Sequence, residues 1–542
     1  MILTEDEVYE DAPPLKAGQT SLATTATLAH TSQPPPPYEE TPLVERSGSS
    51  ALLPSSRGFS KRYSACWRLF KAYCIALLVL AVVGIVWNGL TIGQWNIGWR
   101  DPLSPVIPRP NTSLPHGTTP IDGNIVTCVQ TSDWKTVETV GYSKPDPQRP
   151  SSRSIRIAPN DTVSFTSHAS LSLPLNAAVL YFVNQGSRKA GAVTIESSGK
   201  IGTEIMVNIA VIYKTAHALK HIDVCKVERS SEEVGIALNV NNSYTFGQLQ
   251  PTGDLPVVDM KILIPLSADG SPVVINNLQS TLQFYSHHVE DLRGLVHFRS
   301  IELHALSGPI TVVALSADKA NLSLSSGPIS GSFYVPSIYI KTSNSPITIS
   351  DLVSDEAVVM NVNGPIIGSF NITSLLTLDT SNAPIRAKIT AFSDDNVTSE
   401  IQLNTSNDAI DADVNLYSFD SISGGTFNIS ATCMNGDHLN ISIPVQPENA
   451  DVLVTARGVF TPVFVSLNQA YEGKFQLASV LGSVRLDQHH FEDPTGRNRE
   501  RHVEVHEENP IDVKGDVSWS SEATLRSFAS LWTLRSHALL NL

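Results

Sequence analysis

The chain has 542 residues, too many for one ordinary hydrophobic core, so two or more folded units are expected. Its formal net charge is −15, and no basic stripe occurs outside one short segment before an apolar run, which argues against nucleic-acid binding. Charged residues make up only 16% of the chain, while Ser, Thr, Asn and Val are frequent. This composition favours strands and turns over helices.

The N-terminal segment, 1–68, has the composition of a disordered cytosolic arm. Its first 56 residues carry eight acidic and two basic side chains and no hydrophobic period, so they cannot bury enough apolar surface to fold. Pro35, Pro36 and Tyr38 form a Pro-Pro-x-Tyr motif inside a run of prolines. Such a run prefers the polyproline II helix, which the aromatic grooves of WW domains bind. The motif predicts a WW-domain partner, with a random proline-rich tail as the alternative.

An apolar run at 69–92 predicts a transmembrane signal-anchor helix. The stretch 73–92 is long enough to cross a bilayer, and 72–99 contains no charged residue. The basic residues that precede or open the run are Arg57, Lys61, Arg62, Arg68 and Lys71. Because positive charge stays in the cytosol, we expect a single-pass protein with a cytosolic N-terminus, in the plasma membrane or a secretory-pathway membrane. A cleaved signal peptide, the alternative, would begin near residue 1.

A linker at 93–119 leads to a domain that we expect on the far side of this membrane. N-glycosylation sequons occur only beyond the apolar run, at Asn111, Asn160, Asn241, Asn321, Asn371, Asn396, Asn404, Asn428 and Asn440. A chain rich in Ser and Thr also generates sequons by chance, so they support the orientation without proving it.

The cysteines are too few for a disulfide framework. Five occur, and Cys66 and Cys74 lie at or in the apolar run. Beyond it stand Cys128, Cys225 and Cys433, which allow one disulfide and one free thiol. The pairing is left open, with Cys128 and Cys225 as the first pair to consider.

The far-side domain begins with a β-rich part, 120–300, and continues with a repeat at 301–413. A four-residue signature of small residues and proline recurs there and ends in isoleucine. The signature isoleucines are Ile310, Ile329, Ile347, Ile366, Ile385 and Ile410. They follow one another at steps of 19, 18, 19, 19 and 25 residues. Apolar residues alternate before each signature, which describes a strand, a corner and a further strand.

Stacking such units predicts a β-solenoid, with the isoleucines in its core. Asn344, Asn363 and Asn382 would then lie one above another and could form an amide ladder. Antiparallel hairpins that share a turn motif are the alternative. The remaining part, 414–542, is expected to be further β structure with a charged loop at 487–509. An incomplete final repeat is expected at 532–539.

The arm, the anchor and the repeat together resemble a group of fungal single-pass membrane proteins that carry an adhesin-like domain of unknown function. The resemblance rests on 255–310 with Ile275-Asn276-Asn277-Leu278 and Phe284-Tyr285-Ser286-His287-His288, on the repeat, and on 471–475 with Val513-Lys514-Gly515. It covers most of 120–542 and implies a fold rather than an activity, with no catalytic residue to transfer. The chain departs from the pattern at 536–539, where Ser-His-Ala-Leu replaces a full repeat.

Catalytic motifs are absent from the sequence, so we expect neither an enzyme, a cofactor nor a metal site. A parallel β-helix enzyme that acts on polysaccharides would need acids clustered on adjacent outward positions. Those positions hold His304, Ser323, Lys341, Met360, Asp379 and Asn404, which form no acid pair. The pairs His287-His288 and His489-His490 suggest a metal site, but neighbours in a strand point to opposite faces, which argues against one shared ion. We expect surface histidines instead. Asp408, Asp411 and Asp413 lack the ligand spacing of a calcium loop.

We therefore expect a non-enzymatic membrane glycoprotein whose far-side domain binds or structures cell-surface or cell-wall material. The expected partner is a wall polysaccharide or a surface protein. The first alternative is a membrane adaptor that recruits a WW-domain protein of the ubiquitin-ligase type. A polysaccharide-active enzyme is the second alternative.

Overall fold

The computed structural model describes residues 123–139, 164–186, 191–213, 219, 222–240, 256–393, 397–419, 424–519 and 525–542. All of them belong to the second of two compact units, Leu114–Leu542, and the first unit, Met1–Ser113, lies outside the described residues. Within these ranges the complete elements are 30 strands and one short 3-10 helix, η1 (Thr131–Asp133), and Leu219 is a single described helical residue.

The predicted fold class is wrong as stated. Over the described ranges, no helix has the length and apolarity that a bilayer crossing requires. A spanning helix needs roughly 20 apolar residues, whereas η1 has three. The helix predicted at 69–92 and the arm predicted at 1–68 lie outside the described residues. The structure supports the coarser statement that this chain is mostly β.

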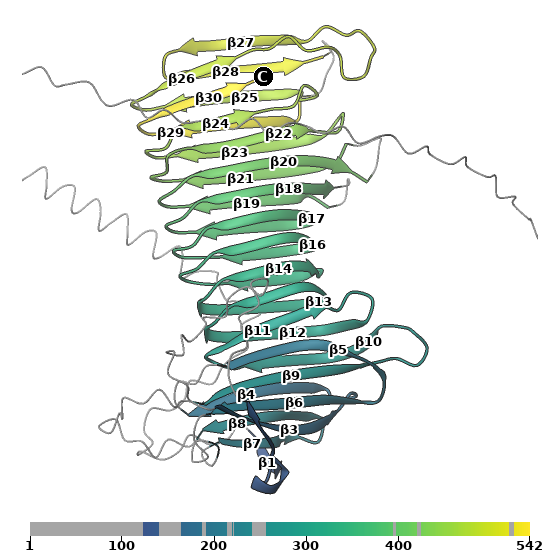
Figure 1. The fold of residues 1–542 in the computed structure, drawn as a ribbon. Coiled ribbons are helices and arrows are strands. Elements are labelled where there is room, and N and C mark those ends of the chain that lie inside the picture. Colours follow the sequence, from purple (N-terminus) through teal and green to yellow (C-terminus); the bar gives the residue numbers. More distant parts are fainter. Residues whose placement is uncertain are drawn as a thin grey trace, which may run out of the picture. The chain divides into compact units, whose positions relative to one another are not determined.

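The strands form two stacks in which most neighbours run parallel (Figure 1). The long strands β13 (Ile310–Ser326), β16 (Ile347–Met360) and β17 (Ile366–Thr380) belong to both stacks, with their first halves in the second stack and their last halves in the first. Because paired residues in these strands are about one repeat apart, each repeat lies one strand spacing, about 4.8 Å, beyond the previous one.

Apart from these shared strands, the first stack contains, in spatial order, β1 (Asn124–Cys128), β7 (Ile222–Ser230), β8 (Glu233–Val240), β4 (Val179–Gly186), β10 (Val273–Thr281), β12 (Val296–Ser307), β15 (Ser337–Lys341), β19 (Ser399–Thr405), β21 (Thr426–Cys433), β23 (Asp451–Gly458), β29 (Ser527–Thr533), β25 (Gly473–Ser479), β28 (Asp512–Ser518) and β27 (His502–Asn509). The second contains β2 (Lys135–Thr139), β3 (Ser164–Pro174), β6 (Glu204–Tyr213), β9 (Val257–Leu266), β5 (Gly191–Ile201), β11 (Tyr285–Asp291), β14 (Ile329–Tyr334), β18 (Ile385–Ser393), β20 (Ile410–Ser418), β22 (Leu439–Val445), β24 (Val463–Ser466), β30 (His537–Asn541) and β26 (Ser483–Asp487).

One hydrophobic core lies along both stacks, because alternate residues of each strand point inward. The six signature isoleucines are fully buried, and each pairs with the next in parallel register. Leu439, Val463 and Ala538 continue this column beyond the repeat. We call these nine residues the isoleucine column.

The regular β-solenoid expected from the repeat is not established by the structure. Paired residues are 19 positions apart from Ile366 to Ile385, but 25 apart from Ile385 to Ile410 and 29 apart from Ile410 to Leu439. Antiparallel pairs also occur at both ends, among them β3 with β6 near the N-terminal end and β25 with β28 near the C-terminal end. Both the spacing and the strand direction therefore vary along the stacks.

Buried polar side chains stabilise the corners between strands. Thr342 donates to the carbonyl of Gly327 at 3.2 Å, Asn361 to that of Ser345 at 2.8 Å and Thr405 to that of Ala383 at 3.2 Å. Each bond satisfies a carbonyl of the preceding corner, which would otherwise lose its hydrogen bond to water on burial.

The C-terminal strands are inserted between strands that precede them in sequence. β29 pairs with β23 on one side and with β25 on the other, and β30 pairs in the same way with β24 and β26. The segment expected to be an incomplete final repeat therefore supplies one full strand to each stack.

The segment predicted as a charged loop, 487–509, is a loop only in part. Its last residues form β27, which pairs antiparallel with β28. Val503 and Val505 alternate with charged residues and pack against the core, which explains why this charge-rich segment forms a strand.

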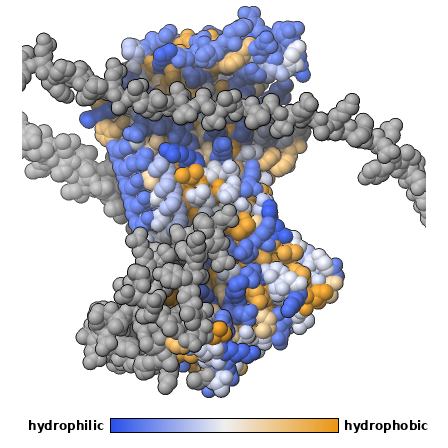
Figure 2. All heavy atoms as spheres, in the orientation of Figure 1, coloured by the Kyte–Doolittle hydropathy of each residue, from blue (hydrophilic) through white to orange (hydrophobic). Residues whose placement is uncertain are grey.

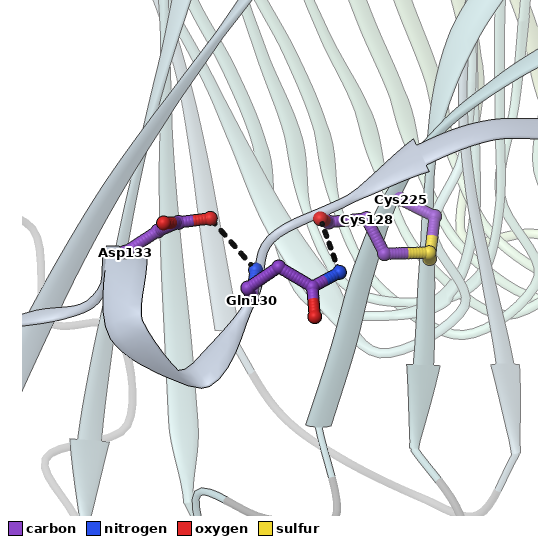
Figure 3. The surroundings of a disulfide bond; sticks show 4 residues. All are labelled: Cys128, Gln130, Asp133 and Cys225. Carbon is purple, nitrogen blue, oxygen red and sulfur yellow. Dashed lines mark hydrogen bonds between the residues drawn. A yellow bond between two sulfur atoms is a disulfide. The ribbon is translucent and has the colours of Figure 1, made fainter.

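A disulfide joins Cys128 and Cys225, which lie opposite each other in β1 and β7 (Figure 3). Beside it, the Gln130 side chain donates to the Cys128 carbonyl at 3.3 Å, and the Gln130 backbone N–H donates to Asp133 at 2.9 Å. The pair considered first from the sequence is thus the bonded pair, and Cys433 is a free, buried cysteine.

Candidate ligand-binding sites on the second stack

Exposed asparagines form an amide ladder just before the strands of the second stack begin. Asn363 donates to Asn344 and Asn382 donates to Asn363, each at 2.8 Å. Asn407 donates to Asn382 at 2.8 Å, and Asn435 donates to Asn407 at 3.2 Å. The predicted ladder of Asn344, Asn363 and Asn382 is confirmed, and the structure extends it by two members.

A pocket lies at the opposite, carboxyl end of these strands and has a volume of about 350 Å³. Its wall includes Tyr334 at the end of β14, Asp355 in β16, Thr373 in β17, Phe392 in β18 and Phe419 just after β20. Figure 2 shows a mainly hydrophilic surface with scattered hydrophobic residues on the visible face. We call this site the aromatic pocket.

Stacked rings form one end of the aromatic pocket. The Phe392 ring lies 5.6 Å from the Tyr417 ring and 5.4 Å from the Phe419 ring, with interplanar angles of 25° and 20°. Phe392 is half-buried, whereas Tyr417 is 42% exposed and Phe419 is 65% exposed. The cluster therefore presents large apolar surface to solvent, where a ligand could cover it.

Polar side chains surround the other end and the middle of the aromatic pocket, although the surface that the pocket itself exposes is almost entirely apolar. The Tyr334 hydroxyl donates to Asp351 at 3.1 Å, and the Asn371 amide donates to the same carboxylate at 3.0 Å. The Thr373 hydroxyl donates to Asp355 at 2.7 Å. These bonds hold hydroxyl, amide and carboxylate groups in fixed positions along the pocket.

Sequence reasoning missed the aromatic pocket. A signal was present, because Phe392 and Tyr417 each stand seven residues after a signature isoleucine, Ile385 and Ile410. The register confirms that these two positions are paired between β18 and β20.

The predicted sequons fall into two groups. Asn321, Asn371, Asn404, Asn428 and Asn440 lie in strands and are half-buried, and Asn371 contributes to the wall of the aromatic pocket. Asn111, Asn160, Asn241 and Asn396 lie outside the described residues, as do Pro35, Pro36 and Tyr38 of the predicted WW-docking motif. Glycosylation and WW docking stay predictions.

The prediction that the paired histidines lie at the surface is wrong for His287. Its side chain is only 1% exposed and bonds to the Ser280 hydroxyl at 2.7 Å through Nε2. Burial lowers the pKa of His287 to about 4, so the imidazole is neutral at physiological pH. His288 points to the opposite face and lies 3.1 Å from Glu290, while His489 and His490 are exposed.

The outward positions considered for catalysis are paired between adjacent strands of the first stack, but Lys341 and Asp379 are separated by Met360, so no two acids are neighbours. Lys341 is exposed, and burial raises the pKa of Asp379. Asp411 pairs with His438 at 2.9 Å rather than with another carboxylate. Over the ranges that the structure covers, no group of three or more His, Cys, Asp or Glu residues is placed to hold a metal ion.

No family model and no curated protein matches this chain. Among solved structures, one described as a "putative cell adhesion protein" from Clostridium sporogenes ATCC 15579 aligns with 69% of this chain and 99% of its own length. The identity is 7% and the TM-score is 0.14, so this likeness carries no argument about function. The resemblance to fungal membrane proteins stays a prediction.

Proposed function

We propose that the β domain is a non-enzymatic binding domain that holds extended material at the cell surface or in the cell wall. The amide ladder is the observation that carries this proposal. Five exposed side chains of one kind repeat along the second stack, each hydrogen-bonded to the next. Their spacing of about 4.8 Å gives a regular row of polar groups, which suits a repeating polymer better than a single small molecule.

The proposal keeps the predicted location at the plasma membrane or a secretory-pathway membrane. A second candidate function is that of an adaptor, which recruits a WW-domain partner through Pro35, Pro36 and Tyr38. The Pro-Pro-x-Tyr motif favours this candidate, because its prolines match the grooves that WW domains offer.

One experiment tests binding and catalysis together. The 542-residue chain is incubated with a panel of wall polysaccharides and surface proteins, with and without Ca²⁺, and retention and product size are measured. We expect retention of a wall polymer or surface protein without new reducing or unsaturated chain ends above a heat-inactivated control. Chain shortening would overturn the non-enzymatic proposal. Absence of any retention would overturn the binding role and favour the adaptor.

A further inference from the structure

We infer that the aromatic pocket binds a neutral polysaccharide chain, with sugar rings packed on its aromatic side chains. This inference rests on the proposed function, because it assigns a ligand class and a set of contact residues to the binding domain. It is carried by three observations: the placement of the rings, the mainly apolar surface with one exposed carboxylate between them, and the charge of the wall.

The aromatic side chains lie at two separated levels of the second stack: Tyr334 in β14, and the Phe392 cluster at the neighbouring strands β18 and β20. Tyr334 pairs with Val353, Val353 with Asn371, and Asn371 with Thr390, which lies in the same strand as Phe392. Three strand spacings therefore separate Tyr334 from the Phe392 cluster, or about 14 Å along the stack. A ligand that touches both levels must be elongated. The apolar C–H faces of successive pyranose rings can pack against aromatic faces at such separated points.

The surface between the two levels is mainly apolar, which suits the C–H faces of sugar rings, and the exposed Asp355 carboxylate beside it can bond a sugar hydroxyl. Asn371 and Thr373 line the middle of the pocket, and Asp355 adds a carboxylate. An ionised carboxylate has more acceptor sites than the Thr373 bond occupies, so Asp355 can also accept a hydrogen bond from a sugar hydroxyl. Apolar ring contacts together with a few fixed polar groups are the usual composition of a small-molecule or polymer site.

The wall argues against other ligand classes. Among the described residues, no Lys, Arg or His lines the pocket, and Arg293, which lies 5.5 Å from the centre of the Tyr334 ring, is already bonded to the Tyr334 hydroxyl and to Asp291. An acidic polymer would therefore meet the Asp355 carboxylate with no unpaired cation in the lining. A peptide that adds as a strand needs an unpaired backbone edge. The strands here, β14, β16, β17, β18 and β20, each have a paired strand on both sides.

The test compares variants of the 542-residue chain, kept in mild detergent and produced in a host without N-glycosylation. Isothermal titration calorimetry measures affinity for β-glucan, chitin and mannan oligosaccharides of defined length. Phe419→Ala and Tyr334→Ala each remove one aromatic contact, and both should weaken binding of the preferred oligosaccharide about tenfold. Phe460→Ala is the matched control, because Phe460 is 50% exposed but does not line the pocket. It should leave the affinity unchanged.

The outcomes separate this inference from the proposed function. Weaker oligosaccharide binding by both pocket variants would support the inference, provided that their circular dichroism is unchanged and that Phe460→Ala keeps the wild-type affinity. Equal affinity of all variants for a retained polysaccharide would overturn the pocket assignment and leave the proposed function standing. Retention only of an acidic polymer or a surface protein would also overturn the inference. If glycosylated protein binds no added glycan but Asn371→Gln restores binding, the pocket holds the chain's own N-glycan, and the inference of an external polymer fails.

Discussion

The imidazole of His287 lies inside the core, where only its neutral form is compatible with burial. The sequence showed that two adjacent histidines in a strand point to opposite faces, but it did not show which of the two faces the core. His287 occupies the inward position, opposite the signature residue Ile310 of the next strand in the second stack. A single register shift would have placed His288 inside instead.

Stability is expected to fall in mild acid because of His287. Its pKa is about 4 in the folded chain and about 6.5 in the unfolded chain, so the unfolded state binds a proton first as the pH falls. The contribution of the neutral His287 imidazole to the free energy of unfolding is complete above pH ~6.5. It is lost progressively between pH ~6.5 and ~4, by about 3 kcal/mol in total. Urea unfolding measures the free energy of unfolding at pH 7.5 and at pH 5. The fall in this free energy from pH 7.5 to pH 5 should be about 2 kcal/mol larger for the wild type than for His287→Gln. Equal pH dependence of the two proteins would contradict this assignment.

Individual strands owe their placement to the isoleucine column, and this is where the sequence was most informative. The steps between signature isoleucines predicted which residues pair, and the amide ladder followed from the same register. The longer step from Ile385 to Ile410 was visible in the sequence, but no signature marks the next step, from Ile410 to Leu439. Antiparallel ends and the insertion of β29 and β30 depend on contacts between distant parts of the chain, which local patterns do not encode.

A charge inside the isoleucine column should unfold its neighbourhood. Ile366 is fully buried and pairs with Ile347 and Ile385, so Ile366→Asp places an unpaired carboxylate in the core. We expect a loss of more than about 3 kcal/mol in the free energy of unfolding. Lys341→Ala, at an exposed position, should change it by less than about 0.5 kcal/mol. Chemical denaturation measures both, and similar small effects would show that the column is not part of the core.

At the scale of the described domain, the C-terminal strands connect parts of the chain that are separate in sequence. β29 lies between β23 and β25 and pairs with both of them. β30 lies in the same way between β24 and β26. Leu531 and Leu540 on these strands are fully buried, so the connection is apolar as well as hydrogen-bonded.

Removing residues 525–542 should therefore loosen the adjacent strands selectively. Hydrogen–deuterium exchange followed by mass spectrometry should show faster exchange in β23, β24, β25 and β26, because each loses a paired neighbour. The strands β5, β9 and β11 have no contact with the removed segment and serve as the internal reference. Uniform faster exchange across all of these strands, or no change in any, would contradict the role given to β29 and β30.

The inserted strands also have a consequence for synthesis of the protein. The ribosome makes β23, β24, β25 and β26 before it makes β29 and β30, so the earlier strands emerge with unpaired edges. Exposed edges recruit other chains, and a delay before closure increases that exposure. Pairing of these edges must therefore await emergence of residues 525–542 from the exit tunnel. Chaperones that shield strand edges would be needed most during that interval.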